Sequence, residues 1–165
     1  SFAEIANSDG EKFMAEPAEI IIYIVDKTEL IAAIISALQV HANAVEGIEN
    51  GQYPARTKDK LINAIVIAAG IRDDESATSL KISQAINDLN AAVARFQSLV
   101  ITNTTGDTNN SGGIDLGDLG KIAGYYGVKA GDPRWDAVKD ADINDDGEIG
   151  LYELAFIARR IFSAN

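Results

Sequence analysis

Two twelve-residue segments of this chain, residues 107–118 and 142–153, carry oxygen-bearing side chains at the same offsets. Positions 1, 3 and 5 are held by Asp107, Asn109 and Ser111 in the first segment and by Asp142, Asn144 and Asp146 in the second. A hard cation such as Ca²⁺ needs about six to eight oxygen ligands, and a short loop delivers them only by folding back on itself. The spacing therefore predicts two calcium-binding loops.

The remaining positions of each loop fit the same chemistry. Position 6 is glycine, where a sharp turn penalises a Cβ atom, and position 7 offers its main-chain carbonyl. Position 12 is an acid that can bind through both oxygens and that suits the positive end of the following helix. The predicted metal ligands of the two loops are Asp107, Asn109, Ser111, Gly113, Asp115, Asp118, Asp142, Asn144, Asp146, Glu148 and Glu153.

Acidic segments rich in Asn and Gly are also typical of solvated turns, and one such loop alone would be ambiguous. Two loops in one register, each followed by a similar helical pattern, favour two Ca²⁺ ions. The loops differ in their acids. Because the second loop has carboxylates at positions 5 and 12 and Asp145 nearby, while the first has Ser111 and the shorter Asp118, we predict tighter binding at the second loop.

The repeat extends into the residues after each loop. An apolar stripe at helical spacing recurs in both copies, as Leu119, Ile122, Ala123 and Tyr126 and then as Leu154, Ile157, Ala158 and Ile161. We expect the two helices to pack together, with Trp135, Val138 and Ala141 covering the pair. About sixty residues provide only a small core, so bound ions should supply much of the folding free energy.

With these residues, the segment from 106 to about 162 resembles the dockerin family, in which a duplicated calcium loop is followed each time by a helix. Asn103, Thr104, Thr105 and Gly106 read as linker, so no helix enters the first loop. This feature disfavours a calmodulin-like EF-hand sensor, in which two helices flank each loop. The resemblance implies that the calcium is structural and that the module docks onto a cohesin module of another secreted protein.

The resemblance also places the docking contacts, at loop positions 10 and 11 and on the outer face of the following helix. These positions correspond to Leu116, Gly117, Gly120, Lys121 and Gly124 in the first repeat and to Leu151, Tyr152, Ala155, Phe156 and Arg159 in the second. The Ser-Thr pair of cellulosomal dockerins is missing, which suggests an apolar docking class. We expect Tyr152, Phe156 and Arg159 to be the anchors. The alternative is that Tyr152 and Phe156 complete the module's own core.

Residues 26–101 show three amphipathic helical patterns, so the expected fold class is all-α: a three-helix bundle followed by the small duplicated calcium module. The first helix should start at Asp26 or Thr28 and end at Gly47, with Leu30, Ile34, Leu38, His41 and Val45 on its stripe. The second should run from a cap at Thr57 to Gly70, and the third should start near Thr78. Short connections imply up-down-up packing, in which His41 is a packed residue.

This bundle is similar to FIVAR modules, the small helical units of extracellular carbohydrate-active proteins. A FIVAR module followed by a dockerin resembles the C-terminal end of large secreted clostridial glycoside hydrolases of the hyaluronidase-toxin type, which implies a catalytic domain outside these residues. The expected organisation is a linker or upstream remnant at 1–25, the bundle at 26–101, a linker at 102–105 and the calcium module at 106–165. Residues 19–25 form a strand-like apolar run.

Composition narrows the remaining functions. With 14 basic and 25 acidic residues and a net charge of -11, the chain offers no basic patch for nucleic acid. Cysteine is absent, but calcium can replace disulfides in a small extracellular module, and we expect a secreted bacterial protein. No transmembrane run or nucleophile–base pair is evident, so neither a membrane span nor a small-molecule substrate is expected. The leading hypothesis is a cohesin-docking module, and the alternatives are an EF-hand-type calcium sensor and a glycan-binding module.

Overall fold

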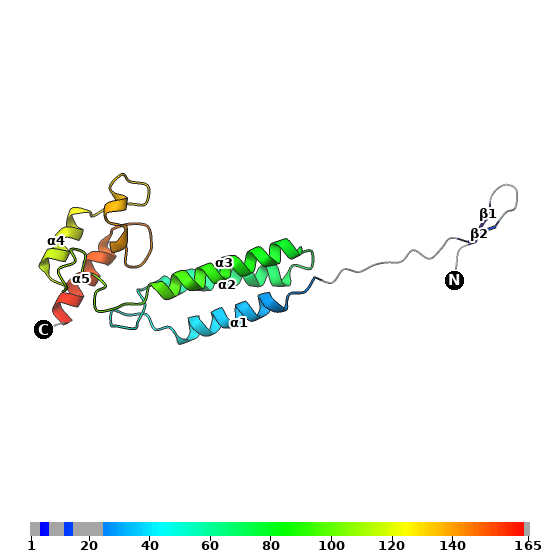
Figure 1. The fold of residues 1–165 in the computed structure, drawn as a ribbon, viewed down its shortest axis with the longest axis horizontal. Coiled ribbons are helices and arrows are strands. Elements are labelled where there is room, and N and C mark those ends of the chain that lie inside the picture. Colours follow the sequence, from blue (N-terminus) through cyan, green and yellow to red (C-terminus); the bar gives the residue numbers. More distant parts are fainter. Residues whose placement is uncertain (1–3, 7–11, 15–24, 164–165) are drawn as a thin grey trace.

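The computed structural model describes residues 4–6, 12–14 and 25–163 of the 165-residue chain. Strands β1 (Glu4–Ala6) and β2 (Lys12–Met14) pair antiparallel, with Ile5 opposite Phe13. From residue 25 onward the fold is all-α, as predicted, and Figure 1 shows a bundle followed by a smaller module. Its helices are α1 (Thr28–Asn43), α2 (Thr57–Asp73), α3 (Ser79–Ser98), α4 (Leu116–Gly124) and α5 (Leu151–Ser163), with 3-10 turns η1 (Trp135–Ala137) and η2 (Lys139–Ala141).

The apolar run at residues 19–25 lies outside the described residues, except for Val25, which packs against the bundle. None of the helices in the described part of the chain combines the length and the hydropathy needed to cross a membrane.

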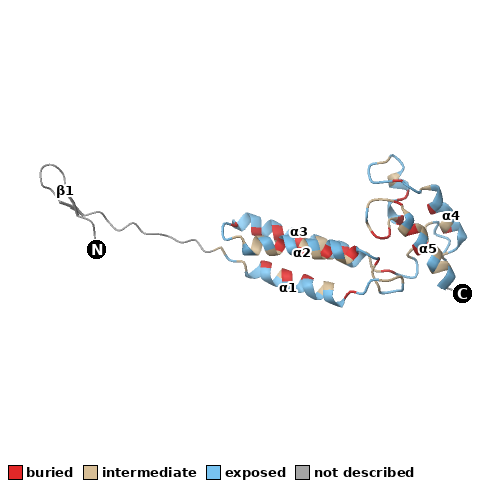
Figure 2. Ribbon diagram, turned by 180° about the vertical axis from the view of Figure 1, so that it is seen from behind, coloured by how far each residue is buried: buried red, intermediate tan, exposed pale blue. Residues whose placement is uncertain are grey.

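Helices α1, α2 and α3 form the predicted three-helix bundle, in which each helix contacts the other two. Figure 2 shows buried residues along the faces that the helices turn toward one another. The core is formed by Leu30, Ile34, Ala37, Ala44, Leu61, Ile65, Ala68, Ala77, Ile82, Ala85, Leu89 and Phe96. Two residues of the predicted stripe in α1 and its continuation are out of phase: Leu38 is 42% exposed and Val45 is 59% exposed, because Ala37 and Ala44 face the core instead.

The helix starts follow local hydrogen bonding. Helix α3 starts where predicted, and Thr78 caps it, its hydroxyl accepting from the Lys81 amide at 3.3 Å. The predicted cap at Thr57 is wrong, because its hydroxyl donates to the Pro54 carbonyl at 2.6 Å instead of accepting from the helix. The chain enters α2 through Arg56, whose φ of 70° lies in the left-handed region.

Residues after α3 build a second core around the packed pair α4 and α5. Ile122 and Ile157, equivalent in the two repeats, are fully buried, and Val138 and Ala141 cover them as predicted. No helix lies between α3 and the first loop, where residues 103–106 form a turn. The second core contains Ile101, Ile122, Val128, Val138, Ala141, Ile143, Ile149, Phe156 and Ile157.

Candidate calcium-binding loops

The first acid of each loop organises the backbone in the same way. Asp107 accepts hydrogen bonds from the amides at positions 5 and 6, at 3.0 and 2.9 Å. Asp142 accepts from the equivalent amides of the second loop, again at 3.0 and 2.9 Å. The two segments predicted as repeats in sequence therefore share one local fold, in which the acid at position 1 draws the loop around itself.

Both loops also turn at the same two places. Gly112 and Gly147, at position 6, have φ values of 92° and 84°, in the region that favours glycine. At position 4, Asn110 and Asp145 have φ values of 58° and 57°, a conformation that Asn and Asp tolerate better than other side chains. These turns aim successive main-chain and side-chain groups toward the inside of each loop.

The acid at position 12 of the first loop, Asp118, is fully buried and fully paired. One carboxylate oxygen accepts from the amides of Thr108 at 2.7 Å and Asn109 at 3.0 Å. The other accepts from the amide of Asp115 at 2.9 Å. Burial alone would raise the pKa of Asp118, but hydrogen bonds from Asp115, Asn109 and Thr108 outweigh it and lower that pKa below its ordinary value.

The equivalent acid of the second loop, Glu153, is equally buried but only half paired. Its Oε2 accepts from the amide of Gly150 at 2.8 Å, whereas Oε1 is buried without a hydrogen-bond partner. Burial raises the pKa of Glu153 to about 7, and the charges of Asp146 and Asp142 add to the effect. The loop thus places a buried acid with one free oxygen near Asp146 and Asp142, and this donor set fits Ca²⁺.

Carboxylates alone do not form either site. In the part of the chain that the structure describes, no three acidic, imidazole or thiol side chains converge closely enough to hold a metal ion by themselves. Each loop would complete its ligand set with the side-chain oxygens of Asn109 and Ser111 or of Asn144, and with the position-7 carbonyl of Gly113 or Glu148. Asp115, predicted as a ligand, caps α4 by accepting from the Gly117 amide at 2.7 Å.

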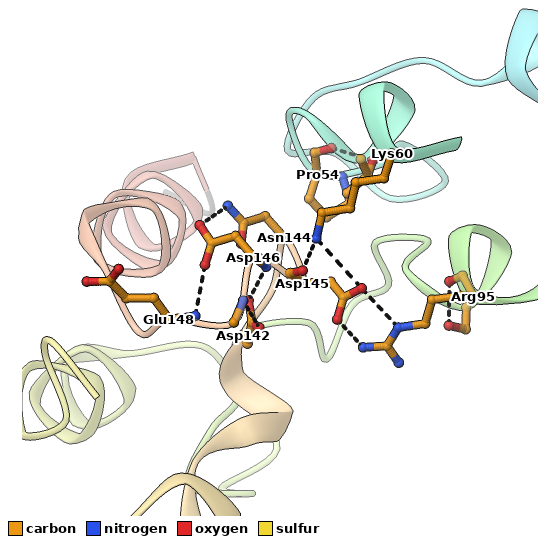
Figure 3. A network of polar contacts seen from close by, with 11 residues as sticks. Pro54, Lys60, Arg95, Asp142, Asn144, Asp145, Asp146 and Glu148 are labelled. Carbon is orange, nitrogen blue, oxygen red and sulfur yellow. Dashed lines mark hydrogen bonds and ion pairs between the residues drawn. The ribbon is translucent and has the colours of Figure 1, made fainter. Parts of the chain in front are cut away.

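Figure 3 shows that the bundle reaches the second loop at position 4. Arg95 of α3 pairs with the Asp145 carboxylate through Nη2 and through Nε at 3.1 Å. Lys60 of α2 donates to the main-chain carbonyl of Asp145 and lies 3.8 Å from its Oδ2. The hydrogen bond from Arg95 lowers the pKa of Asp145. Sequence reasoning placed Asp145 beside the metal and missed both cations, because they are distant in sequence and belong to exposed helix faces.

The residues predicted to contact a partner divide into two groups. Leu116 and Leu151, at position 10 of the two loops, are 73% and 71% exposed. The remaining exposed members of the predicted set are Gly117, Gly120, Lys121, Gly124, Ala155 and Arg159.

Tyr152 and Phe156 turn inward instead. Phe156 is 2% exposed and belongs to the second core, which corrects its predicted place on the outer face. The half-buried Tyr152 packs on that core, and its hydroxyl accepts from the Ala55 amide of the bundle at 3.0 Å. The two aromatic rings lie four residues apart on one face of α5, with centroids 6.2 Å apart, while Leu151 lies on another face. The alternative reading of these two aromatics as core residues is therefore the one that their positions favour.

Comparison with known proteins gives one informative similarity. No family model matches the sequence. The chain is 33% identical over 138 residues to a gellan lyase from Bacillus sp.. The aligned region covers 84% of this chain but only 6% of that protein. The similarity therefore concerns one segment of a much longer relative.

Proposed function

We propose that this segment is a calcium-stabilised docking module carried on a helical spacer. Each twelve-residue loop holds one Ca²⁺ ion, and the exposed faces of α4 and α5 bind a cohesin-type module. The observation that carries the calcium assignment is the buried, unpartnered Oε1 of Glu153 in a loop whose other groups are satisfied. A cation at this point supplies the missing partner.

In the second loop, Asp142, Asn144, Asp146 and Glu153 hold the ion together with the carbonyl of residue 148. In the first loop the ligands come from Asp107, Asn109, Ser111, Asp118 and the carbonyl of residue 113, with Asp115 adjacent. When bound, Ca²⁺ neutralises carboxylates that otherwise repel one another. The chain's own contribution is to fix the start of α4 and of α5, because Asp118 and Glu153 are both ligands and first-turn helical residues. Calcium is therefore structural in this proposal.

The proposed docking surface is defined by Leu116 and Leu151, together with the exposed helix positions after each of them. Two large apolar side chains stand exposed at equivalent positions of the repeat. Lys121 and Arg159 follow on the exposed faces of the same helices. Each repeat thus presents an exposed leucine and a cation on the helix that follows it, which suits a protein partner that offers an apolar patch with acidic groups around it.

The relative's name supports a polysaccharide-degrading context for the parent protein. Because the shared segment is 6% of that relative, we place the chemistry of the parent in other domains and assign none to this segment. The relative is a lyase and not a hydrolase, so the similarity does not favour a glycosidase, and the hyaluronidase-like parent stays a hypothesis that rests on the family resemblance alone. An extracellular location follows from the proposal, because millimolar calcium there keeps weak sites filled.

A binding assay with purified cohesin modules tests the docking function. We expect binding in calcium, none in EDTA, and at least a tenfold loss on Leu116→Asp, roughly the cost of a lost interface anchor. Leu80→Asp is the matched control, since Leu80 is 79% exposed on α3, away from the docking surface. Binding that survives EDTA, or equal losses from the two variants, would contradict the proposal.

A further inference from the structure

The second loop is attached to the bundle by both its main chain and its side chains. Lys60 and Arg95 bind Asp145 at position 4 (Figure 3), and the adjacent Tyr152 and Glu153 end the same loop. The hydroxyl of Tyr152 accepts from the Ala55 amide at 3.0 Å. Two points of one loop, at positions 4 and 11, thus touch three residues from α2, α3 and the connection that precedes α2.

Helix α5 extends the same attachment. Arg160 donates to the carbonyls of Ile48 at 3.0 Å and Thr102 at 3.1 Å. Ile48 packs against the second core, although it belongs to the connection between α1 and α2. Ile101 exchanges main-chain hydrogen bonds with that connection, donating to Gln52 at 2.8 Å and accepting from Gly51 at 2.9 Å. The second repeat and the α1–α2 connection therefore form a continuous polar and apolar interface.

The first loop has no comparable attachment. Asn110, equivalent to Asp145, is exposed and makes no side-chain hydrogen bond to the bundle among the described residues. Lys121, the cation closest to this loop, donates to the Thr108 carbonyl within the same module. Among the described residues, the side-chain contacts between a calcium loop and the bundle are therefore concentrated at the second loop.

We propose that calcium in the second loop fixes the helical bundle relative to the docking module, with Arg95 and Lys60 as the positioning residues that couple the bundle to the loop. The inference rests on the proposed function, because it requires that Ca²⁺ occupies this loop. It adds that the bundle is rigidly coupled to the docking module when the ion is present and loosely coupled when it is absent.

The physical reason lies in the order of residues along the loop. Asp145, whose φ is 57°, stands between the proposed ligands Asn144 and Asp146, so a movement of these ligands also moves Asp145. Without a cation, the carboxylates of Asp142, Asp146 and Glu153 repel one another, and Glu153 keeps an unpaired buried oxygen. Loosening of the loop shifts Asp145 and Tyr152 together, and both are contact points with the bundle.

The structure offers a charge-balanced variant that breaks the attachment and leaves the ligands in place. Arg95→Met with Asp145→Asn removes one positive and one negative charge, and Asn already occupies position 4 in the first loop. The matched control is Lys139→Met with Asp136→Asn. It removes another ion pair of the module, Lys139 Nζ to Asp136 Oδ1 at 3.0 Å, which involves no proposed calcium ligand and no residue of the bundle.

Amide hydrogen exchange of the intact chain, at saturating calcium and in EDTA, tests the proposal at the amides of Ala55 and Ile101. At a calcium concentration near 100 times Kd, full coupling would slow the exchange of these amides about a hundredfold relative to EDTA. In the wild type and the control we expect calcium to slow their exchange by at least about tenfold. In the Arg95→Met/Asp145→Asn variant, calcium should slow the exchange of these amides by less than about threefold.

Equal calcium-dependent slowing in the variant and the wild type would overturn the proposal, as would an unchanged Ala55 amide in a wild-type protein whose loop amides respond to calcium. Calorimetry on the same samples separates this result from a failure of the proposed function. If no heat of calcium binding is detected, the calcium assignment fails and the coupling fails with it. If calcium binds and Ala55 does not respond, only the coupling fails.

Discussion

The two loops share a backbone and differ in what their acids are paired with. In the first loop the buried acid at position 12, Asp118, is saturated by amide donors. In the second loop the equivalent Glu153 keeps one oxygen unpaired, while Asp145 at position 4 is bound by cations from the bundle. The first loop can therefore hold its shape with its own hydrogen bonds, whereas the second has a shape that needs a cation.

The difference separates two uses of one motif. A loop whose position-12 acid already accepts three amide hydrogen bonds gains less from a metal ion, because the charge of Asp118 is already stabilised. A loop with a buried unpaired carboxylate gains more, because the ion removes a desolvation cost. The comparison thus supports the predicted order of affinities, with the second loop tighter, and gives it a cause beyond the number of acids.

Removal of calcium should have the largest effect. At a calcium concentration near 100 times Kd, each occupied site stabilises the folded chain by about 2.7 kcal/mol. Trp135, the single tryptophan, packs on the second core, so its fluorescence reports the unfolding of this module. We expect urea unfolding in EDTA to shift strongly to lower concentration. A transition that does not move with calcium would remove the structural role of the ion.

The pH dependence of the calcium-free protein should come next. Because the folded-state pKa of Glu153 is about 7 against an ordinary 4.5, the folded chain holds this proton more tightly than the unfolded chain. The contribution of Glu153 to stability is then fully present below pH 4.5 and falls by roughly 3 kcal/mol as the pH rises toward 7. Urea titrations in EDTA should show this fall, and Glu153→Gln should abolish it. A flat profile in the wild type would contradict the burial argument.

Asp118→Asn should be harmful with or without calcium. The pKa of Asp118 is lowered, so its hydrogen bonds stabilise the fold above pH 3.8 and are lost as the pH falls through the folded-state value. The Asn side chain would place its own N–H group against the main-chain N–H donors of the loop, which costs about 2 kcal/mol of stability. Unfolding free energies in calcium and in EDTA should drop together. If only the calcium-loaded form is affected, Asp118 acts solely as a ligand and the contrast between the loops is weaker than described.

The smallest effects should come from position 4. Asp145→Asn breaks a half-exposed pair with Arg95 and should cost about 1 kcal/mol or less, whereas Asn110→Asp breaks no bond to the bundle and should fall within about 0.5 kcal/mol. Chemical denaturation of both variants in the same buffer measures the difference. Equal costs would indicate that the bundle contact at Asp145 contributes nothing to stability.

Sequence patterns predicted the elements but not the contacts between them. The three bundle helices and the start of α3 near Thr78 follow from local signals, chiefly helical periodicity. The buried face of α1 was harder to predict, because alanine is buried about as readily as leucine. Ala37 faces the core at the place where Leu38 was expected. Phe156 and Tyr152 are equivalent in the repeat to the exposed residues Lys121 and Gly117. Their inward orientation became clear only from the packing of α5.

The calcium ligands were predictable because their chemistry is local. Twelve consecutive residues contain nearly the whole donor set, so spacing alone identifies them. The contacts of Lys60 and Arg95 with Asp145 join residues 85 and 50 positions apart, and no local pattern encodes them. The unequal pairing of Asp118 and Glu153 was also beyond prediction, because residue spacing does not show which carboxylate oxygens reach the loop amides.

Calcium titration calorimetry on the intact chain and on Glu153→Gln tests whether the two loops bind calcium unequally. We expect two sites of unequal affinity in the wild type, and an affinity at the tighter site that is lower in the variant by on the order of a hundredfold or more. The weaker site, in the first loop, should be unchanged. Absence of calcium binding, or persistence of the tighter site in Glu153→Gln, would contradict the account.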